Sequence, residues 1–176
     1  METKTAGEMM IPLDMYPHIP YWFTIRQAAA EIQHSSLEIN GRKSLARAVL
    51  VFDEEYKLLG MVRRRDIIRG LNPEKDIEKP SKHSRSYVEI HADPELLEIS
   101  FNSLVKKLPE MADKPVSDIM TPVNMTLNFG DHIMKIIYEM NEHKASMLPV
   151  MKEDVVVGVV RTVEVMNEIA HLLEIE

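Results

Sequence analysis

The sequence predicts a mixed α/β fold made of two copies of one unit, joined by a connection that contains an extra helix. An apolar strand, an acidic turn, a second apolar strand and a glycine occur twice in this order, with Gly60 and Gly158 98 positions apart. In both copies two apolar residues, an arginine and then a carboxylate follow the glycine. A Met-x-Pro segment precedes each copy, at Met10–Pro12 and Met120–Pro122. This large spacing indicates a duplicated unit and not a short solenoid repeat.

The first unit opens with an amphipathic helix. Thr24 lies three residues before Gln27, which is the spacing of a capping box at a helix N-terminus. Apolar residues then recur with a helical period, so the helix covers residues 24–34. The polar segment 34–47 contains Asn40-Gly41 and is predicted to be a loop.

Two strands and a closing helix complete this unit. Ala48–Phe52 and Lys57–Val62 are short apolar runs separated by an acidic turn, a pattern typical of a β-hairpin. Arg64–Leu71 is predicted to be a helix that stops before Pro73, because a residue before proline disfavours the α conformation.

The second unit repeats this order. A helix that opens at Gly130-Asp131 carries isoleucines on one face. The strands Met147–Met151 and Val155–Arg161 follow, and a closing helix covers residues 163–173. Each unit therefore reads as helix, strand, strand and helix.

The connection between the units is long. The first unit covers residues 7–71 and the second covers 115–173, which leaves 72–114 between them. Asp93-Pro94 is an N-cap with proline at the first helical position, and an apolar stripe follows it. We expect a helix over 94–108 that Pro109 terminates. Such a connection either packs on the core or serves as a binding segment.

Composition excludes several classes of protein. The chain has 176 residues, a formal net charge of -7 and no cysteine. The acidic balance argues against nonspecific nucleic-acid binding, and the lack of cysteine excludes disulfides and thiolate metal sites. The seven histidines show no metal-binding spacing, so no metal is expected. Neither a signal peptide nor an apolar run of roughly 20 residues is present, which predicts a soluble cytoplasmic protein that does not associate with membranes.

The ordered motifs resemble those of the cystathionine-β-synthase (CBS) domain family. In the second copy they are Asp118-Ile119-Met120-Thr121-Pro122, a helix, Leu148-Pro149-Val150, Gly158-Val159-Val160 and a carboxylate four residues further on. The first copy matches less cleanly in the same order, so the chain resembles a tandem CBS pair.

The resemblance implies two β-α-β-β-α repeats packed about a pseudo-twofold axis, with two clefts between them. In that family the clefts often bind AMP, ADP, ATP or S-adenosylmethionine and thereby regulate a partner protein. Pairs of repeats commonly form homodimers, and the family is generally not catalytic. No obligatory cofactor is implied.

The resemblance also implies the residues of each cleft. In members that bind nucleotides, a serine or threonine meets phosphate and an aspartate three residues later meets the ribose hydroxyls. The corresponding residues here are Arg63 with Asp66, and Arg161 with Glu164. The implied apolar walls for adenine are Ile11, Pro12, Val62, Leu148, Pro149 and Val160.

The two arginines admit two interpretations. A guanidinium at a strand end, beside a helix N-terminus, can hold phosphate through a bidentate, charge-assisted contact. Alternatively, each arginine pairs with the carboxylate three residues later and fills the cleft. Glu164 is one methylene longer than Asp66, so the cleft with Arg63 and Asp66 is the favoured nucleotide site.

Two functional hypotheses follow. The first is a regulatory module that senses an adenine nucleotide and controls a partner protein. The second is an oligomerisation scaffold whose clefts are degenerate and free of nucleotide. No nucleophile or base stands in a recognisable catalytic arrangement, so an enzyme is not expected.

Overall fold

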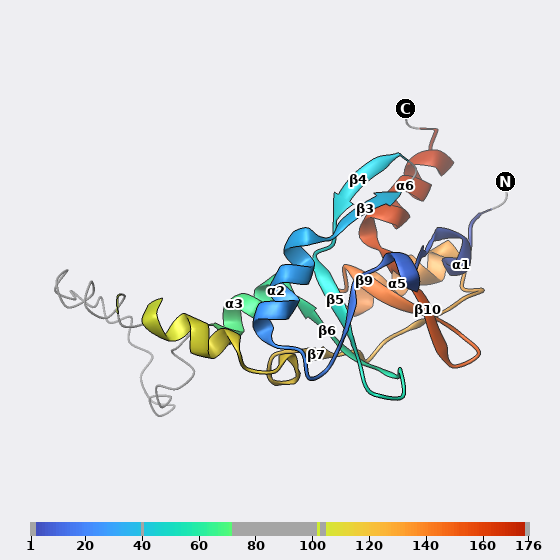
Figure 1. Cartoon of the computed structure of the whole chain (residues 1–176). Coiled ribbons are helices and arrows are strands. Elements are labelled where there is room, and N and C mark those ends of the chain that lie inside the picture. The colour runs from blue at the N-terminus through green and yellow to red at the C-terminus, as the bar shows by residue number, and fades with distance from the viewer. Residues whose placement is uncertain (1–2, 40, 72–101, 103–104, 175–176) are drawn as a thin grey trace, which may run out of the picture.

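The computed structural model describes residues 3–39, 41–71, 102 and 105–174, which form two similar α/β units (Figure 1). Each unit has a four-stranded sheet with helices on its outer face. The strand orders are β2-β5-β6-β7 and β8-β9-β10-β1, so one sheet repeats the arrangement of the other. This equivalence agrees with the predicted pseudo-twofold relation.

The first unit has the order β-α-β-β-α, with one insertion. Its elements are β2 (His18–Pro20), α2 (Ile25–His34), β5 (Ala48–Phe52), β6 (Leu58–Arg63) and α3 (Arg64–Gly70). Thr24 caps α2 as the sequence predicts, because its hydroxyl accepts a hydrogen bond from the Gln27 backbone N–H.

The second unit has the same order without the insertion. Its elements are β8 (Leu127–Asn128), α5 (Ile133–Glu142), β9 (Met147–Lys152), β10 (Val155–Arg161) and α6 (Thr162–Leu172). Strands β9 and β10 pair in antiparallel register, with Leu148 opposite Val160. The helix α5 begins two residues later than the predicted opening, with His132 as its N-cap.

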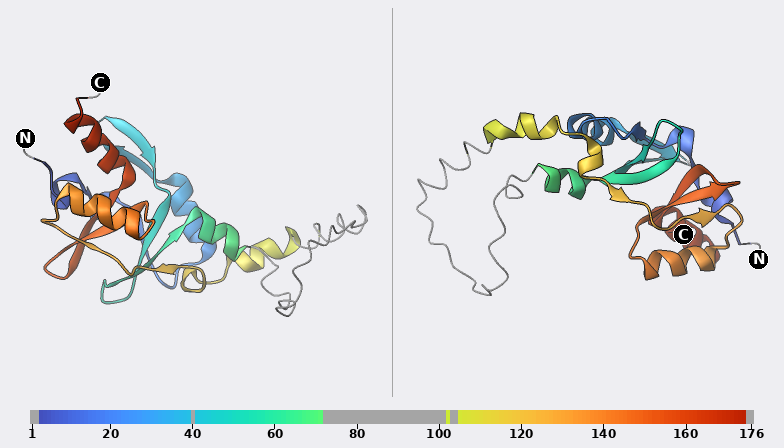
Figure 2. Two further views of the ribbon diagram at one scale, coloured as in Figure 1. Left: turned by 180° about the vertical axis from the view of Figure 1, so that it is seen from behind. Right: turned by 90° about the horizontal axis from the view of Figure 1, so that it is seen from below.

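The segment predicted as a loop, residues 34–47, is instead a β-hairpin inserted into the first unit. Strands β3 (Ser36–Ile39) and β4 (Arg42–Leu45) pair in antiparallel register. Gly41 lies between them with a φ of 75°, a backbone conformation that glycine adopts without strain. The hairpin lies beside α6 of the other unit in both Figure 1 and the left view of Figure 2.

The two Met-x-Pro segments are exchanged between the sheets. Strand β1 (Ile11–Pro12) lies at the start of the chain but pairs with β10 of the second unit, and β7 (Thr121–Pro122) pairs with β6 of the first. The N-terminal helix α1 (Ala6–Met9) goes with β1 and packs on the second unit. Two 3-10 turns, η1 (Leu13–Met15) and η3 (Val116–Asp118), adjoin these segments.

The duplicated glycines allow the exchanged strands to approach closely. A Cβ on Gly60 would lie 2.6 Å from the Thr121 carbonyl oxygen, and one on Gly158 would clash with the Ile11 carbonyl oxygen. Any side chain at either position would therefore push the exchanged strand away. This explains why both copies of the pattern carry glycine here.

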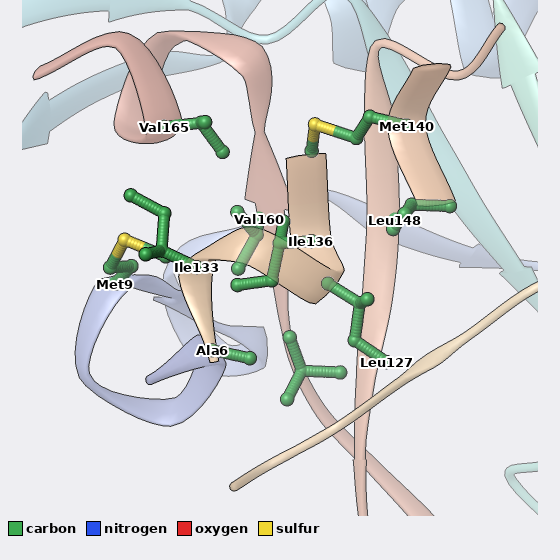
Figure 3. Packing of buried hydrophobic residues seen from close by; sticks show 10 residues of the cluster. Ala6, Met9, Leu127, Ile133, Ile136, Met140, Leu148, Val160 and Val165 are labelled. Atoms are coloured by element: carbon green, nitrogen blue, oxygen red, sulfur yellow. The ribbon is translucent and has the colours of Figure 1, made fainter. Parts of the chain in front are cut away.

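Among the residues that the structure describes, three hydrophobic clusters hold the fold together. One lies under the helices of the second unit and contains Ile136, Leu148 and Val160 (Figure 3). A second has the corresponding place in the first unit and contains Ile25 and Val62. The third joins the two sheets and also contains Leu37 of the inserted hairpin.

The helix predicted over 94–108 runs past Pro109, because residues 105–112 are helical. The remainder of that prediction lies outside the described residues. Proline removes one backbone donor from a helix. Contacts with the rest of the protein stabilise the last turn of this helix. Met111 is buried, and Arg26 of α2 donates a hydrogen bond to the Pro109 carbonyl oxygen and forms an ion pair with Asp113. These tertiary contacts explain why the proline does not end the helix.

Candidate functional site

The first candidate site lies where β6 ends and α3 begins. Asp66, in the first turn of α3, accepts hydrogen bonds at 2.9 Å from both the backbone N–H and the Nε of Arg63. The carboxylate therefore caps the helix and pairs with the arginine at the same time. Asp66 is fully buried, whereas the Arg63 side chain is 26% exposed.

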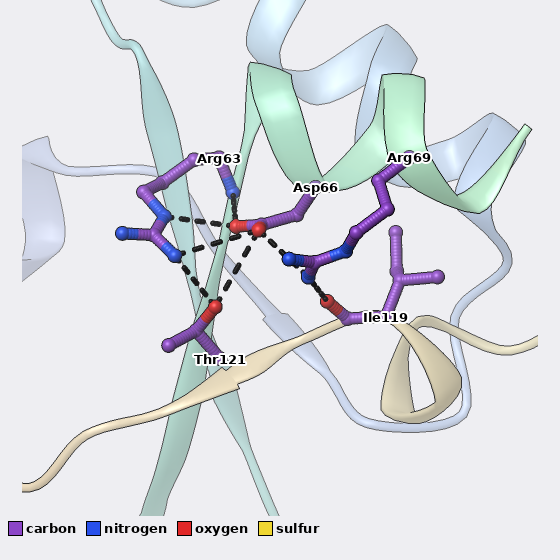
Figure 4. A network of polar contacts seen from close by, with 5 residues as sticks. All are labelled: Arg63, Asp66, Arg69, Ile119 and Thr121. Atoms are coloured by element: carbon purple, nitrogen blue, oxygen red, sulfur yellow. Dashed lines mark hydrogen bonds and ion pairs between the residues drawn. The ribbon is translucent and has the colours of Figure 1, made fainter. Parts of the chain in front are cut away.

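Two further side chains, those of Arg69 and Thr121, contact Asp66 (Figure 4). Arg69 donates from Nη2 to Asp66 Oδ1 at 2.9 Å and to the Ile119 carbonyl oxygen at 3.2 Å. Thr121 of the exchanged strand β7 accepts from Arg63 Nη2 at 2.6 Å. Its hydroxyl and Arg63 Nη2 both also donate to Asp66 Oδ1, at longer distances of 3.4 Å. Two cations thus flank one carboxylate.

This environment determines the charge of Asp66. Burial raises its pKa, but the hydrogen bonds and positive charges of Arg63 and Arg69 outweigh burial and hold the pKa below its usual value. The carboxylate is therefore ionised at neutral pH. With both arginines charged, the site keeps an excess of positive charge.

The second candidate site lies at the equivalent junction of β10 and α6. Glu164 accepts from the Arg161 backbone N–H at 2.9 Å, from Nε at 3.0 Å and from Nη2 at 2.6 Å. The remaining nitrogen, Nη1, donates to Ser44 Oγ of the inserted hairpin at 2.8 Å. Both side chains are buried, at 11% and 8% exposure. Every nitrogen of this guanidinium is therefore engaged inside the protein.

Tyr16 lies beside this second pair, between the two sheets. Burial raises the pKa of Tyr16 to about 12, while the charge of Arg161 lowers it and that of Glu164 raises it. Leu37 of the hairpin and Met147 of β9 pack in the same cluster. The inserted hairpin thus occupies the space between the repeats on this side.

A cavity of about 420 Å³ lies between the hairpin and α6, and the Arg161–Glu164 pair forms part of its lining. Its lining residues are Ile39, Arg42, Ser44, Arg161, Val163, Glu164, Asn167, Ala170 and His171. Three of these residues belong to the hairpin of the first unit and six belong to the second unit.

The structure brings each predicted arginine together with its carboxylate, so the self-paired arrangement is present at both junctions. The predicted apolar residues are more dispersed. Val62, Leu148 and Val160 are buried in the cores of their own units. Ile11 faces the cluster between the sheets, Pro149 is buried opposite Val159, and Pro12 is exposed.

Sequence reasoning missed three polar partners: Arg69, Thr121 and Ser44. Arg69 follows Asp66 by three positions, a helical spacing that signals an ion pair and could have been found. Thr121 belongs to a recognised motif, but its contact with Arg63 depends on the strand exchange. Ser44 gives no signal, because the sequence predicts a loop over the segment that forms the hairpin.

Within the described residues, no group of three or more histidine, aspartate or glutamate side chains could hold a metal ion. In the same part of the chain, none of the helices combines the length and apolarity that crossing a membrane requires.

Comparison with known proteins identifies the family. The CBS domain model matches residues 24–72 and 116–171, more than half of the chain. The chain therefore belongs to the CBS domain family and carries two CBS domains in tandem, as the sequence predicts. Among curated proteins, none matches the sequence significantly.

Solved structures share this fold over nearly the whole chain. The crystal structure of CBSX2 in complex with AMP is 16% identical, with a TM-score of 0.62, over 96% of this chain and 98% of that one. The CBS domain of a CBS domain containing membrane protein from Sphaerobacter thermophilus is 18% identical, with a TM-score of 0.63, over 94% and 87%. The cytosolic domain of the Mg2+ channel MgtE in complex with ATP is 18% identical, with a TM-score of 0.59, over 94% and 49%. At these identities the likeness establishes the fold alone.

Proposed function

We propose that this chain is a cytoplasmic regulatory module that binds an adenine nucleotide at the Arg63–Asp66 junction and thereby controls a partner protein. The observation that carries the proposal is the excess of cationic donors around Asp66. Arg63 and Arg69 share one carboxylate, and Arg63 Nη1 makes no hydrogen bond to any described residue. AMP and ATP are the ligands in two of the structures with this fold.

The charge around this junction suits a phosphate group. Arg64 and Arg65 are exposed in the first turn of α3, next to Arg63. Guanidinium groups bind phosphate through charge-assisted hydrogen bonds, and clustered positive charge raises the local concentration of anions even on an acidic protein. We therefore expect the phosphate group to bind the solvent-exposed guanidinium nitrogens of Arg63 and Arg69.

Asp66 suits the ribose hydroxyls, because a carboxylate accepts hydrogen bonds from both members of a vicinal diol. Its Oδ1 already receives two weak contacts, the 3.4 Å ones from Arg63 Nη2 and Thr121. A ribose hydroxyl that replaces these two contacts leaves the 2.9 Å bonds to Arg63 and Arg69 in place. We propose that six apolar residues contact adenine in the two clefts, through backbone atoms or as apolar walls: Ile11, Pro12, Val62, Leu148, Pro149 and Val160. Of these, Val62 belongs to the cleft that contains Asp66.

The second junction is the weaker nucleotide site. All three guanidinium nitrogens of Arg161 are engaged, and the hairpin lies against it. We therefore expect one adenine nucleotide per chain, at the first junction.

Titration calorimetry with AMP and with adenosine tests this function. The wild type should bind both, AMP more tightly. Arg63→Ala should weaken AMP about tenfold or more and adenosine much less, because only AMP carries the anion. Arg26→Ala, which removes an exposed arginine of the same repeat, should leave both affinities unchanged.

Two outcomes would contradict the proposal. One is the absence of AMP binding to the wild type at millimolar concentration. The other is binding that occurs only after Arg63→Ala, which would show that the arginine blocks the cleft.

The scaffold function is the second candidate, and a separate observation favours it. Helices α5 and α6 expose the apolar side chains Met134, Tyr138, Val163 and Met166. Exposed apolar surface of this kind marks an interaction site, and we propose that a second copy of the chain covers it. Light scattering at micromolar concentration should give a dimer, and a species of 20.3 kDa alone would exclude it.

A further inference from the structure

An exposed aromatic surface lies at the end of the β5–β6 hairpin that is farthest from α3 (Figure 1). Trp22 and Tyr56 are 53% and 57% exposed. Tyr21 links Trp22 to the turn, because the two rings pack edge-on with centroids 5.2 Å apart and the Tyr21 hydroxyl donates to Glu54 Oε1 at 2.8 Å. The Asp66 junction is at the other end of β6. We define the aromatic turn surface as Tyr21, Trp22, Glu54, Glu55 and Tyr56.

The ring of Tyr56 is held in place although it is exposed. It stacks on the buried Phe52 with ring centroids 4.9 Å apart, and its hydroxyl lies 2.6 Å from His18 Nε2. Its backbone φ is 62°, a conformation that is unfavourable for a bulky side chain and that proteins tend to keep at functional positions. Phe52 covers one face of this ring, so the other face is available to a partner.

The second unit shows what an aromatic ring at this place contacts. Phe129 has the place of Tyr21, because the backbone N–H of each donates at 2.9 Å to a carbonyl oxygen of the adjacent parallel strand, β9 or β5. The residue after that carbonyl is Lys152 in the second unit and Asp53 in the first. Lys152 Nζ lies over the Phe129 ring, 4.8 Å from its centroid. The first unit therefore has a carboxylate where the second supplies its own cation.

Charge at the aromatic turn surface favours a cationic partner. The face of an aromatic ring carries partial negative charge and attracts ammonium and guanidinium groups. Within the part of the chain that the structure describes, no lysine or arginine lies over the ring of Trp22 or Tyr56. The turn 53–57 contains three carboxylates and one lysine, and both Glu54 and Glu55 are exposed.

Shape favours a peptide over a small molecule. The rings of Trp22 and Tyr56 are more than half exposed, whereas small-molecule sites bury most of the surface of their ligand. We infer that the aromatic turn surface binds a basic segment of a partner protein, whose arginine or lysine side chains contact the exposed rings and the two glutamates. The inference rests on the proposed function for the existence of a partner and adds the chemistry of that partner.

Hexa-arginine with blocked ends is the probe, and calorimetry and fluorescence measure its binding. Trp22 is the single tryptophan of the chain, so its emission reports directly on this surface. The wild type should bind hexa-arginine with a saturable change in emission. Glu54→Gln combined with Glu55→Gln should weaken binding about fivefold or more, because two attractive charges are removed. The amide oxygen of the first substitution can still accept the Tyr21 hydroxyl.

A matched variant controls for the overall acidity of the chain, whose net charge is -7. Glu153→Gln combined with Asp154→Asn removes two charges from the equivalent β9–β10 turn and should leave the affinity for hexa-arginine unchanged. Thermal unfolding confirms that both double variants are folded. Equal losses in the two double variants would overturn the inference, because they would show that a polycation is attracted to the acidic protein as a whole.

Trp22→Leu tests the aromatic ring itself. It keeps an apolar side chain but removes the ring face, so calorimetry should show binding of hexa-arginine weakened about threefold or more. Unchanged affinity would overturn the inference, as would the absence of hexa-arginine binding to the wild type at millimolar concentration. Free arginine that binds as tightly as hexa-arginine would overturn the assignment to a peptide.

Arg63→Ala separates this inference from the proposed function. It should weaken AMP binding and leave the affinity for hexa-arginine unchanged. If hexa-arginine binds through the aromatic turn surface and AMP does not bind, the proposed nucleotide site alone is contradicted. If AMP binds and hexa-arginine does not, this inference alone is contradicted.

Discussion

The junctions at Arg63 and Arg161 have the same local geometry but different surroundings. In both, an arginine ends a strand. A carboxylate three residues later accepts hydrogen bonds from the backbone N–H and from the Nε of that arginine. At the first junction a second arginine, Arg69, joins the pair, and the Arg63 side chain remains 26% exposed. At the second, the hairpin completes the arginine's hydrogen bonds, and the side chains of Arg161 and Glu164 are only 11% and 8% exposed. The comparison teaches that one local motif can give a cationic, accessible site or a closed ion pair, according to its tertiary neighbours.

The closed pair should carry the larger structural cost when it is broken. Glu164→Gln leaves the buried charge of Arg161 without a counter-ion, so we expect a loss of about 3–5 kcal/mol in the free energy of unfolding. Urea denaturation measures this loss, with the exposed Glu142→Gln as a control that should change little. A loss no larger than that of Asp66→Asn would remove the distinction between the junctions.

Alkaline titration probes the same closed region through Tyr16. Its pKa is raised in the folded state, so its contribution to stability is complete below about pH 10 and is lost as the pH rises to about 12. The loss should be about 2–3 kcal/mol over this interval. Tyr16→Phe should remove this dependence and the late step of the ultraviolet phenol titration. The comparison fails if the wild type and Tyr16→Phe show the same alkaline profile.

Breaking the first pair should cost less. Arg63 and Arg69 are 26% and 50% exposed, so water can solvate them after Asp66→Asn, and we expect a loss of about 2 kcal/mol at neutral pH. Because the folded pKa of Asp66 is lowered, its contribution is present above about pH 4 and disappears as the pH falls through the folded value. Wild type and Asp66→Asn should therefore converge in stability on acidification. A difference that stays constant to low pH would show that the charge of Asp66 is not the cause.

The smallest expected effect concerns the hairpin contact. Ser44→Ala removes one hydrogen bond to Arg161 and should lower the free energy of unfolding by about 1 kcal/mol. Leu45 is exposed on the same strand, and Leu45→Ala is the control. An effect of Ser44→Ala no larger than that of the control would show that the hairpin does not support this junction.

The sequence predicts most of the fold, because most elements depend on local patterns. The apolar runs of β5, β6, β9 and β10 and the capping box of α2 are visible in short windows of residues. The hairpin was missed although Asn40-Gly41 is also a turn signal for paired strands, since its flanking residues are mostly polar. The exchange of β1 and β7 was not foreseen, because two-residue strands carry no periodic signal.

The candidate site was predictable only in part, for the same reason. Each arginine and its carboxylate are three residues apart, so their pairing could be weighed from the sequence. The partners that distinguish the two junctions are distant: Thr121 lies 58 residues from Arg63, and Ser44 lies 117 from Arg161. Such contacts depend on how the units dock and not on any local pattern.

The exchange of end strands has a consequence for the time course of synthesis. Strand β1 comprises residues 11 and 12 and pairs with Val159 and Gly158 of β10, which lie far along the chain. During translation at roughly 5–20 residues per second, β1 must therefore wait roughly 7–30 seconds until β10 has been made. Contacts between such distant residues are slow to form. Strand β1 can thus be locked in place only after β10 has been made, although it is synthesised long before β10.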